Sequence, residues 1–143
     1  DNLRSAWNVG TNFRSADGFG FAHAYLGGIT PTPESDAVTK TSLGAEDTVQ
    51  WTYHKDAVKL VRTLKKKGWL VWSLEEHERA MPLSANVDAE NSRPVVLIVG
   101  NEVTGVDPGL LALSESIFHI PMQGDKQSFN VAIAFGIAAY QLK

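Results

Sequence analysis

The chain has 143 residues, of which 43% are hydrophobic and 20% are charged, with a formal net charge of −3. This length and composition predict one globular domain over residues 1–143, and no apolar run is long enough to cross a bilayer. The chain contains no cysteine, which excludes disulfides and thiolate metal sites and fits a cytoplasmic protein. It opens without an initiator Met and without a signal peptide, so we expect a trimmed polypeptide.

The first third of the sequence predicts one helix, two strands and a long loop. A helix is expected over residues 9–17, because Asn8 is a suitable N-cap and glycines follow the segment. The aromatic and apolar residues 21–26 predict a buried strand, and residues 49–53 predict a second one. Between them, threonines and prolines predict a loop over residues 30–45.

The clearest helix covers residues 56–67, where apolar side chains recur at helical spacing from Ala57 to Leu64. Three lysines in its last turn suit the helix dipole. The nearly continuous β-branched run 94–99 is typical of a central parallel strand. The remaining segments predict strands over residues 69–74 and 116–120, a polar loop over 82–93 and a short helix over 110–113.

Residues 128–143 predict a final helix with Ser128 as its N-cap. The helix is apolar on almost every face between Val131 and Tyr140, so all of its sides need cover. In so small a domain, a partner subunit is the expected cover, which predicts a homodimer. Strands that alternate with helices predict an α/β fold, with a mostly parallel sheet flanked by helices.

Three segments carry the candidate chemistry, and the first is residues 8–17. Its polar features are Asn8 and Arg14, and each also has a plain interpretation. Asn8 could simply cap a helix, and Arg14 could form a surface ion pair with Asp17, which is typically worth little. The sequence offers no cluster of metal ligands, because its four histidines are scattered.

The second and third segments, residues 97–105 and 120–132, each include the end of an expected strand. In an open parallel sheet, ligands bind at the carboxyl ends of strands. Gly100 would permit close backbone approach to a cofactor, and Glu102 could hold an arginine or a loop amide. A turn glycine with a solvated glutamate is the alternative interpretation. Ser128 and Asn130 open an otherwise apolar helix, which indicates a binding site better than a cap alone.

In this order and at this separation, the three segments resemble the signature motifs of the TrmH/SpoU family of the SPOUT superfamily. The resemblance implies S-adenosylmethionine as the cofactor, and methyl transfer to a ribose 2′-hydroxyl of tRNA or rRNA as the reaction. It implies a trefoil knot near the C-terminal end of the fold. It also implies a homodimer whose active site lies at the subunit interface, built on a nearly bare catalytic core.

The resemblance also implies a role for each matching residue. The implied catalytic residues are Asn8, Arg14, Glu102, Ser128 and Asn130. The implied cofactor-binding residues are Leu74, Gly100, Ile120, Met122 and Phe129, the last in place of the family's usual Leu. The arginine would act in the active site of the neighbouring subunit. Because a guanidinium stays protonated, a role in orienting the hydroxyl and its adjacent phosphate is easier to defend than a role as a base.

The negative net charge disfavours nucleic acid as a partner, but phosphate binding depends on local patches rather than on the total. Basic residues cluster in the range 55–67, and Arg4 and Arg14 form a second group. Three alternatives stay open: a SPOUT enzyme that methylates a base nitrogen, a catalytically inactive RNA-binding relative, and a plain nucleotide-binding α/β protein. No Gly-x-Gly-x-x-Gly or Walker loop supports the last of these.

Overall fold

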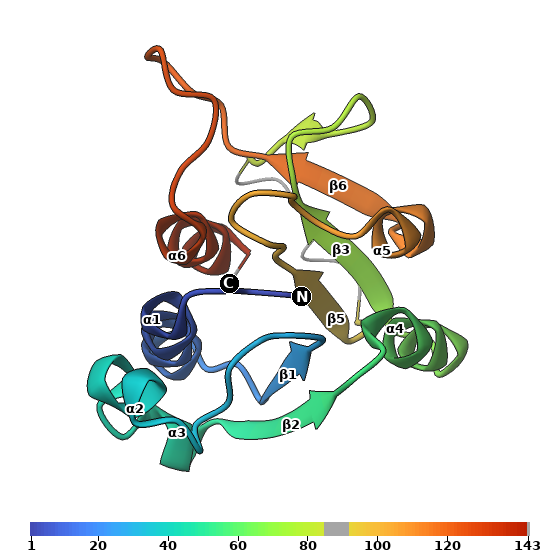
Figure 1. The fold of residues 1–143 in the computed structure, drawn as a ribbon. Helices are drawn as coiled ribbons and strands as arrows, with labels where there is room; N and C mark the ends of the chain where they lie inside the picture. The colour runs from blue at the N-terminus through green and yellow to red at the C-terminus, as the bar shows by residue number, and fades with distance from the viewer. Residues whose placement is uncertain (85–91, 143) are drawn as a thin grey trace.

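The computed structural model describes residues 1–84 and 92–142, and it has the expected α/β architecture (Figure 1). The strands are β1 (His23–Gly27), β2 (Gln50–His54), β3 (Leu70–Leu74), β4 (Met81–Pro82), β5 (Val95–Ile98) and β6 (Ser116–His119). The helices are α1 (Ala6–Gly18), α2 (Asp36–Ser42), α3 (Ala45–Thr48), α4 (Ala57–Lys66), α5 (Pro108–Leu113) and α6 (Val131–Gln141). Most of the predicted loop 82–93 lies outside the described residues. No helix in the described ranges is long and apolar enough to cross a membrane.

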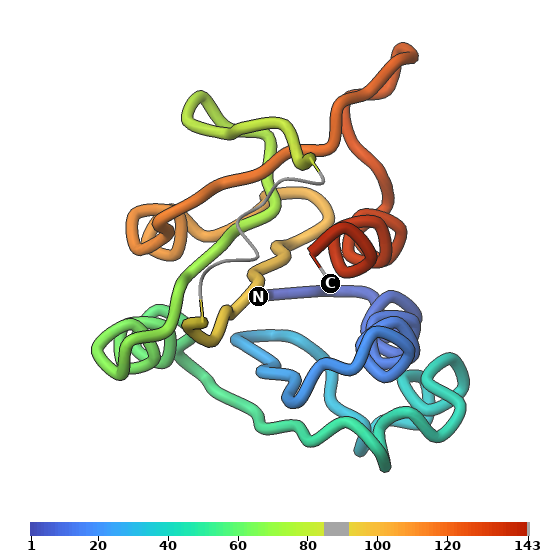
Figure 2. Tube along the Cα trace, turned by 180° about the vertical axis from the view of Figure 1, so that it is seen from behind, coloured from blue at the N-terminus to red at the C-terminus, as the bar shows by residue number. Residues whose placement is uncertain are grey.

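The named strands pair only in parallel, as predicted, but they form two separate sheets. β1 pairs with β2, and the other strands follow the order β4-β6-β3-β5. β5 therefore lies at an edge of the larger sheet, and the prediction of a central strand over residues 94–99 is wrong for the strands described. β1 and β5 lie near each other in both views without pairing (Figures 1 and 2).

Two apolar cores lie on the two sides of the strands. The first core joins α1 and α6 to the smaller sheet, with Val9, Phe13 and Phe135 among its buried residues. The second packs α4 and α5 against the larger sheet, around Val71 and Leu110. Helices α1 and α6 therefore lie together on one side of the molecule and α4 and α5 on the other (Figure 1).

Helix α1 begins before its predicted start, because Ser5 rather than Asn8 is the N-cap. The Ser5 hydroxyl accepts a hydrogen bond from the Asn8 backbone amide at 3.2 Å. Serine is as good a capping residue as asparagine, so the sequence contained two competing signals three residues apart. The predicted capping role of Asn8 is wrong. Asn8 instead lies in the first turn, where it is buried and its side-chain amide is available for other partners.

The loop predicted over residues 30–45 contains helix α2 and the start of α3. Helix α2 has no apolar stripe, because its buried residues are Val38, Thr41 and Ser42. It packs closely on α1, and Gly10 allows this approach. A Cβ at Gly10 would collide with the Val38 carbonyl and the Thr41 hydroxyl. The glycine of the first segment therefore serves helix packing.

Gly10→Ala should destabilise the fold by about 1–3 kcal/mol, since the added methyl group forces α1 and α2 apart. Gly18→Ala is the matched control, because a Cβ at that end of the same helix meets nothing within 4 Å. The control should change stability by less than about 1 kcal/mol. Urea unfolding of both variants measures the difference, and equal midpoints would refute the packing role of Gly10.

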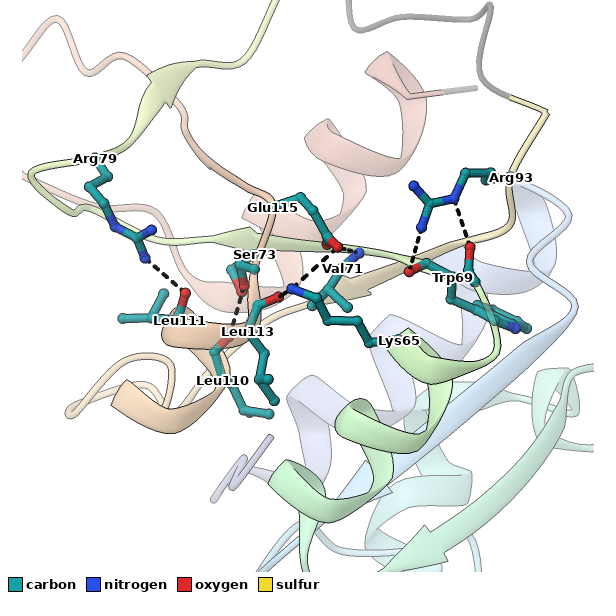
Figure 3. Close-up of polar contacts among 12 residues, drawn as sticks. Lys65, Trp69, Val71, Ser73, Arg79, Arg93, Leu110, Leu111, Leu113 and Glu115 are labelled. Atoms are coloured by element: carbon teal, nitrogen blue, oxygen red, sulfur yellow. Dashed lines mark hydrogen bonds and ion pairs between the residues drawn. The ribbon is translucent and has the colours of Figure 1, made fainter.

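Helix α4 lies close to its predicted bounds and begins at an Asp56 N-cap, whose carboxylate accepts the Lys59 amide at 3.0 Å. Polar contacts hold α4 against the end of α5 and the residues that precede β6 (Figure 3). The Lys65 ammonium donates to the Leu113 carbonyl at 2.7 Å and lies 3.3 Å from the Glu115 carboxylate. Lys65 is therefore engaged within the fold, which weakens the predicted basic cluster of residues 55–67 as a binding surface.

Candidate active site

A cavity of about 390 Å³ lies where β3 and β6 end, beside the loop after β5 and the start of α6. Parallel strands bring their carboxyl ends to one edge of the sheet, so the segments that follow them meet there. Seven of the residues singled out by the sequence line this cavity: Leu74, Gly100, Glu102, Ile120, Ser128, Phe129 and Asn130. The second and third segments thus converge at one place, although the binding roles of their residues stay predictions.

The Glu102 carboxylate joins the second segment to the start of α1. It accepts hydrogen bonds from the Arg4 amide at 2.9 Å, from the Ser5 amide at 3.1 Å and from Asn8 Nδ2 at 3.1 Å. Amides at a helix N-terminus lack intrahelical partners and carry partial positive charge, so a carboxylate suits them. The sequence indicated that Glu102 could hold an arginine or a loop amide, and in the structure it holds backbone amides.

Asn8 extends this network to the third segment. Its Oδ1 accepts from Asn130 Nδ2 at 3.2 Å, and Asn130 Oδ1 accepts from the Ala132 amide at 2.9 Å. Asn130 is therefore the N-cap of α6. The prediction that Ser128 caps this helix is wrong, because the helix begins only after the asparagine. Asn8 thus contacts both Glu102, which lies 94 positions later in the sequence, and Asn130, which lies 122 positions later.

The same network holds Glu102 in its ionised form. Burial alone would raise the pKa of Glu102, but hydrogen bonds from the amides of Arg4 and Glu102 itself, from the Asn8 side chain and from the Ser5 amide outweigh this effect. The pKa therefore lies below its ordinary value of 4.5. A negative charge consequently lies beside the cavity near neutral pH.

The pKa of Glu102 makes a prediction about stability. A carboxyl whose pKa is lower in the folded than in the unfolded state stabilises the fold above the unfolded value, and this contribution is lost as the pH falls through the folded value. The wild type should therefore be more stable than Glu102→Gln near neutral pH, and the gap should close below pH 4.5. Urea unfolding of both proteins between about pH 7 and pH 3 measures the gap. A gap that does not change with pH would contradict the assignment.

Three candidate residues do not line the cavity. Asn8 reaches it only through Glu102 and Asn130. Arg14 is exposed on α1, and its position six residues after Asn8 places it on another side of that helix. Met122 follows β6 but is not part of the cavity wall. The cavity of one chain therefore does not include the predicted catalytic arginine.

Glu75, Glu76 and His119 also line the cavity, and the sequence analysis does not single them out. The Glu76 carboxylate lies 3.3 Å from His119 Nδ1, and the Glu75 carboxylate accepts the Val106 amide at 2.8 Å. The signal that could have found them is their position: the glutamates directly follow β3, and His119 ends β6. Grouping His119 with scattered histidines overlooks this shared edge of the sheet.

Gly100 allows a tight loop rather than only a close approach to a ligand. A Cβ at Gly100 would collide with the backbone of Gly105 and Val106. Gly105 has a φ of 75°, and a Cβ there would collide with the Glu75 carboxylate. Together the two glycines let the loop after β5 fold against the carboxyl end of β3, where it forms one wall of the cavity.

The cavity combines apolar walls with charged and amide groups. Leu74, Val99 and Ile120 supply apolar surface, while Glu102 and Asn130 supply polar groups. Such a lining suits an organic ligand that has both flat apolar and charged parts. Among the described residues, no group of three or more histidines and carboxylates is arranged to hold a metal ion.

The structure is that of an α/β protein with a cavity at the carboxyl edge of a parallel sheet, where a ligand site is expected. Residues 1–140 match the profile of the SpoU rRNA Methylase family. The chain therefore belongs to this family.

Known relatives resemble the chain over almost its whole length. A tRNA (guanosine(18)-2′-O)-methyltransferase from Thermus thermophilus is 27% identical over 99% of this chain and 70% of that protein. A structure from Porphyromonas gingivalis, assigned to the TrmH family of RNA methyltransferases, has a TM-score of 0.88 and 31% identity over 99% of this chain and 56% of that one. An AdoMet-bound rRNA methyltransferase from Sinorhizobium meliloti has a TM-score of 0.86 and 27% identity over 97% of this chain and 52% of that one. The chain thus spans about half of each of these two solved chains.

Proposed function

We propose that this chain is the catalytic domain, over residues 1–143, of an S-adenosylmethionine-dependent methyltransferase that modifies a ribose 2′-hydroxyl of tRNA or rRNA. The observation that carries the proposal is the network of Asn8, Glu102 and Asn130, which gathers three distant segments at one cavity. Family membership supports the reaction, as does the Thermus relative named for 2′-O-methylation. The AdoMet-bound relative supports the cofactor.

The cavity lining fits S-adenosylmethionine in its chemistry. Leu74, Ile120 and Phe129 would hold the flat adenine, and the backbone at Gly100 would lie against the cofactor. The ionised Glu102 lies beside the cavity and suits a cationic ligand. Met122 belongs to the proposed set because it follows Ile120 on the same loop, although it lies outside the cavity wall.

The cofactor, when bound, supplies an electrophilic methyl group on a sulfonium. The chain's own contribution is to position the RNA, and positioning alone can contribute up to about 7–11 kcal/mol. Asn8, Glu102 and Asn130 fix the segments around the cavity. Ser128 is exposed at its wall, so its hydroxyl is free to contact the RNA. Arg14 would orient the 2′-hydroxyl and the adjacent phosphate, since it stays protonated and presents several donors in one plane.

A homodimer would complete this site. Helices α1 and α6 pack together (Figure 1). Both helices also expose large apolar residues. Trp7 is 69% exposed, Ile133 54% and Tyr140 71%. A second copy packed on these faces would cover them, and it would bring Arg14 of one subunit to the cavity of the other. This arrangement explains why the arginine lies outside the cavity of its own chain.

We propose that RNA binds on the side of the molecule where α1 and the cavity lie. Arg4, just before α1, and Arg14, on α1, are both exposed. The basic residues of α4 lie on the other side of the sheets, where Lys65 is held by Glu115. We therefore propose that Arg4 and Arg14, rather than the basic residues of α4, make the main contacts with RNA phosphates.

The proposal also includes the trefoil knot and a cytoplasmic location. Strand β6 lies between β3 and β4, which both precede it in the chain, and α6 then returns to pack on α1. Such a return path, with the close structural likeness to a TrmH-family protein, supports the knot. The cytoplasmic location follows from the proposed substrates.

The test is methylation of total RNA from a strain that lacks the gene. The purified protein, with labelled S-adenosylmethionine, should add methyl groups that nucleoside mass spectrometry finds on a ribose 2′-oxygen. Ser128→Trp, which would fill the cavity from its exposed wall, is the control that should lose both methylation and cofactor binding. A methylated ring nitrogen would favour a base methyltransferase instead. RNA binding without methylation would favour an inactive relative.

A further inference from the structure

Four aromatic or polar side chains share one face of the smaller sheet. β1 and β2 pair in parallel with Tyr25 beside Thr52, and His23 and His54 lie two residues away along their own strands (Figure 1). Side chains two residues apart on a strand point to the same face. Leu26 points the other way, into the first core, so the four side chains lie on the face of the sheet opposite α1.

The two histidines of this face converge on the hydroxyl of Thr52. His23 Nε2 and His54 Nε2 each lie 2.9 Å from Thr52 Oγ1. A hydroxyl has one proton to donate, so it donates to one imidazole and accepts the N–H of the other. Parallel pairing thus brings two ring nitrogens, which lie far apart in the sequence, to a single atom.

The surroundings hold both imidazoles in this orientation. The Tyr25 ring lies 4.4 Å from the His23 ring and 5.8 Å from the His54 ring, measured between centroids. His54 lies beside Gly27 in the register of the strands, and the lack of a side chain there leaves room for the imidazole to lean towards Thr52. The two rings are therefore ordered before any ligand arrives, which lowers the entropic cost of binding.

Paired imidazoles are typical ligands of late first-row transition metals. Imidazole suits Zn²⁺, Cu²⁺ and Ni²⁺, whereas Mg²⁺ and Ca²⁺ prefer oxygen. If both histidines take the tautomer with the proton on Nδ1, both Nε2 lone pairs face Thr52. An ion about 2.0–2.1 Å from each nitrogen would then take the place of the two hydrogen bonds to the hydroxyl.

We propose that His23 and His54 form a binding site for one divalent transition-metal ion such as Zn²⁺, with the Thr52 hydroxyl and water as its other ligands. In the described ranges, no group of three or more histidines and carboxylates is arranged for a metal, so the two imidazoles carry this site. None of its three residues lines the candidate active site. The ion would link β1 to β2, and the inference does not depend on the proposed enzymatic activity.

Zinc titration of the wild type, His23→Gln and His54→Gln tests the proposal. Calorimetry should find one ion per wild-type chain, and each substitution should weaken binding by more than about tenfold, the least that loss of an outer-shell partner typically costs. Free zinc about 100-fold above the dissociation constant should raise the melting temperature of the wild type by about 5–10 °C. His119→Gln is the matched control and should bind zinc like the wild type, because His119 pairs with Glu76 instead.

Nitrogen NMR of the histidine side chains tests the geometry without any substitution. Zinc should shift the Nε2 signals of His23 and His54 in the wild type, while Nδ1 of both rings keeps its proton. Mg²⁺ at the same concentration should leave these signals unchanged, because it prefers oxygen ligands. A Gln variant that fails to fold therefore leaves this measurement intact.

Three outcomes would overturn the proposal. The first is zinc binding that survives both His23→Gln and His54→Gln, and the second is binding that His119→Gln abolishes. The third is an affinity weaker than millimolar, which would indicate an adventitious ion only. Unchanged Nε2 signals of the two histidines at saturating zinc would contradict the site in the same way.

Discussion

Arg14→Ala should abolish methyl transfer while the affinity for S-adenosylhomocysteine stays unchanged. Arg14 is exposed on α1 and lies outside the cavity, so its removal leaves the proposed cofactor contacts intact. Removing one charged donor that stabilises a transition state typically costs on the order of 100-fold or more in kcat. Turnover on RNA with labelled cofactor, together with calorimetry of S-adenosylhomocysteine binding, measures the two effects separately.

Arg62→Ala is the matched control for this experiment. Arg62 is also an exposed arginine on a helix, but α4 lies on the other side of the sheets. Its loss should leave turnover near the wild-type rate. Arg14→Lys separates charge from shape, because lysine keeps the charge but lacks the planar set of donors. An Arg14→Ala enzyme with near wild-type turnover would end the proposed role.

Elements with a strong local pattern could be predicted from the sequence. The apolar stripe of residues 57–64 predicted helix α4, and the structure confirms the helix, with Asp56 as its N-cap. Helix α2 could not be found in this way, because its buried face consists of Val38 and two hydroxyl residues. The cap of α1 was ambiguous for a related reason, since Ser5 and Asn8 are equally good capping residues. Tertiary packing against Gly10, rather than local propensity, determines where α2 lies.

The place of β5 in the sheet shows another limit of sequence patterns. Its β-branched residues indicate burial on both faces, but burial does not reveal which strands are its neighbours. In the structure, β3 is the one named strand that pairs with it in the described part of the chain. The pattern therefore predicts a strand here, but not its place at the edge of the larger sheet among the described residues.

The candidate site was predictable where it follows the ends of strands. Leu74, Gly100 and Ile120 line one cavity because parallel strands end at the same edge. The bond between Asn8 and Asn130 was not predictable, because it joins residues 122 positions apart and needs Asn8 to be inside α1 rather than at its cap. The proposed action of Arg14 in the cavity of a neighbouring subunit could come only from the resemblance, because nothing in the pattern around Arg14 indicates which surface it faces.

Ile137→Asp should convert the protein to a monomer and abolish its activity. Ile137 is 38% exposed on α6, and neighbouring exposed residues of that helix continue the same apolar surface. A charge there would be buried without a partner in the proposed interface, which typically costs several kcal/mol. Ile29→Asp is the control, since Ile29 is 67% exposed in the loop between β1 and α2 and belongs to neither helix. Light scattering should report one chain mass for Ile137→Asp and two for the control.

Mixed dimers test whether the subunits share their sites. Arg14→Ala leaves the cavity intact, and Ser128→Trp fills it, so each homodimer alone should be inactive. If Arg14 acts across the interface, a mixed dimer has one site with both defects and one with neither. Half of the dimers in a fully exchanged equimolar mixture are mixed, so activity should return to about a quarter of the wild-type level. If Arg14 acts within its own chain, every site has one defect and the mixture stays inactive. A wild-type protein that remains fully active as a monomer at nanomolar concentration would refute both the interface and the shared site.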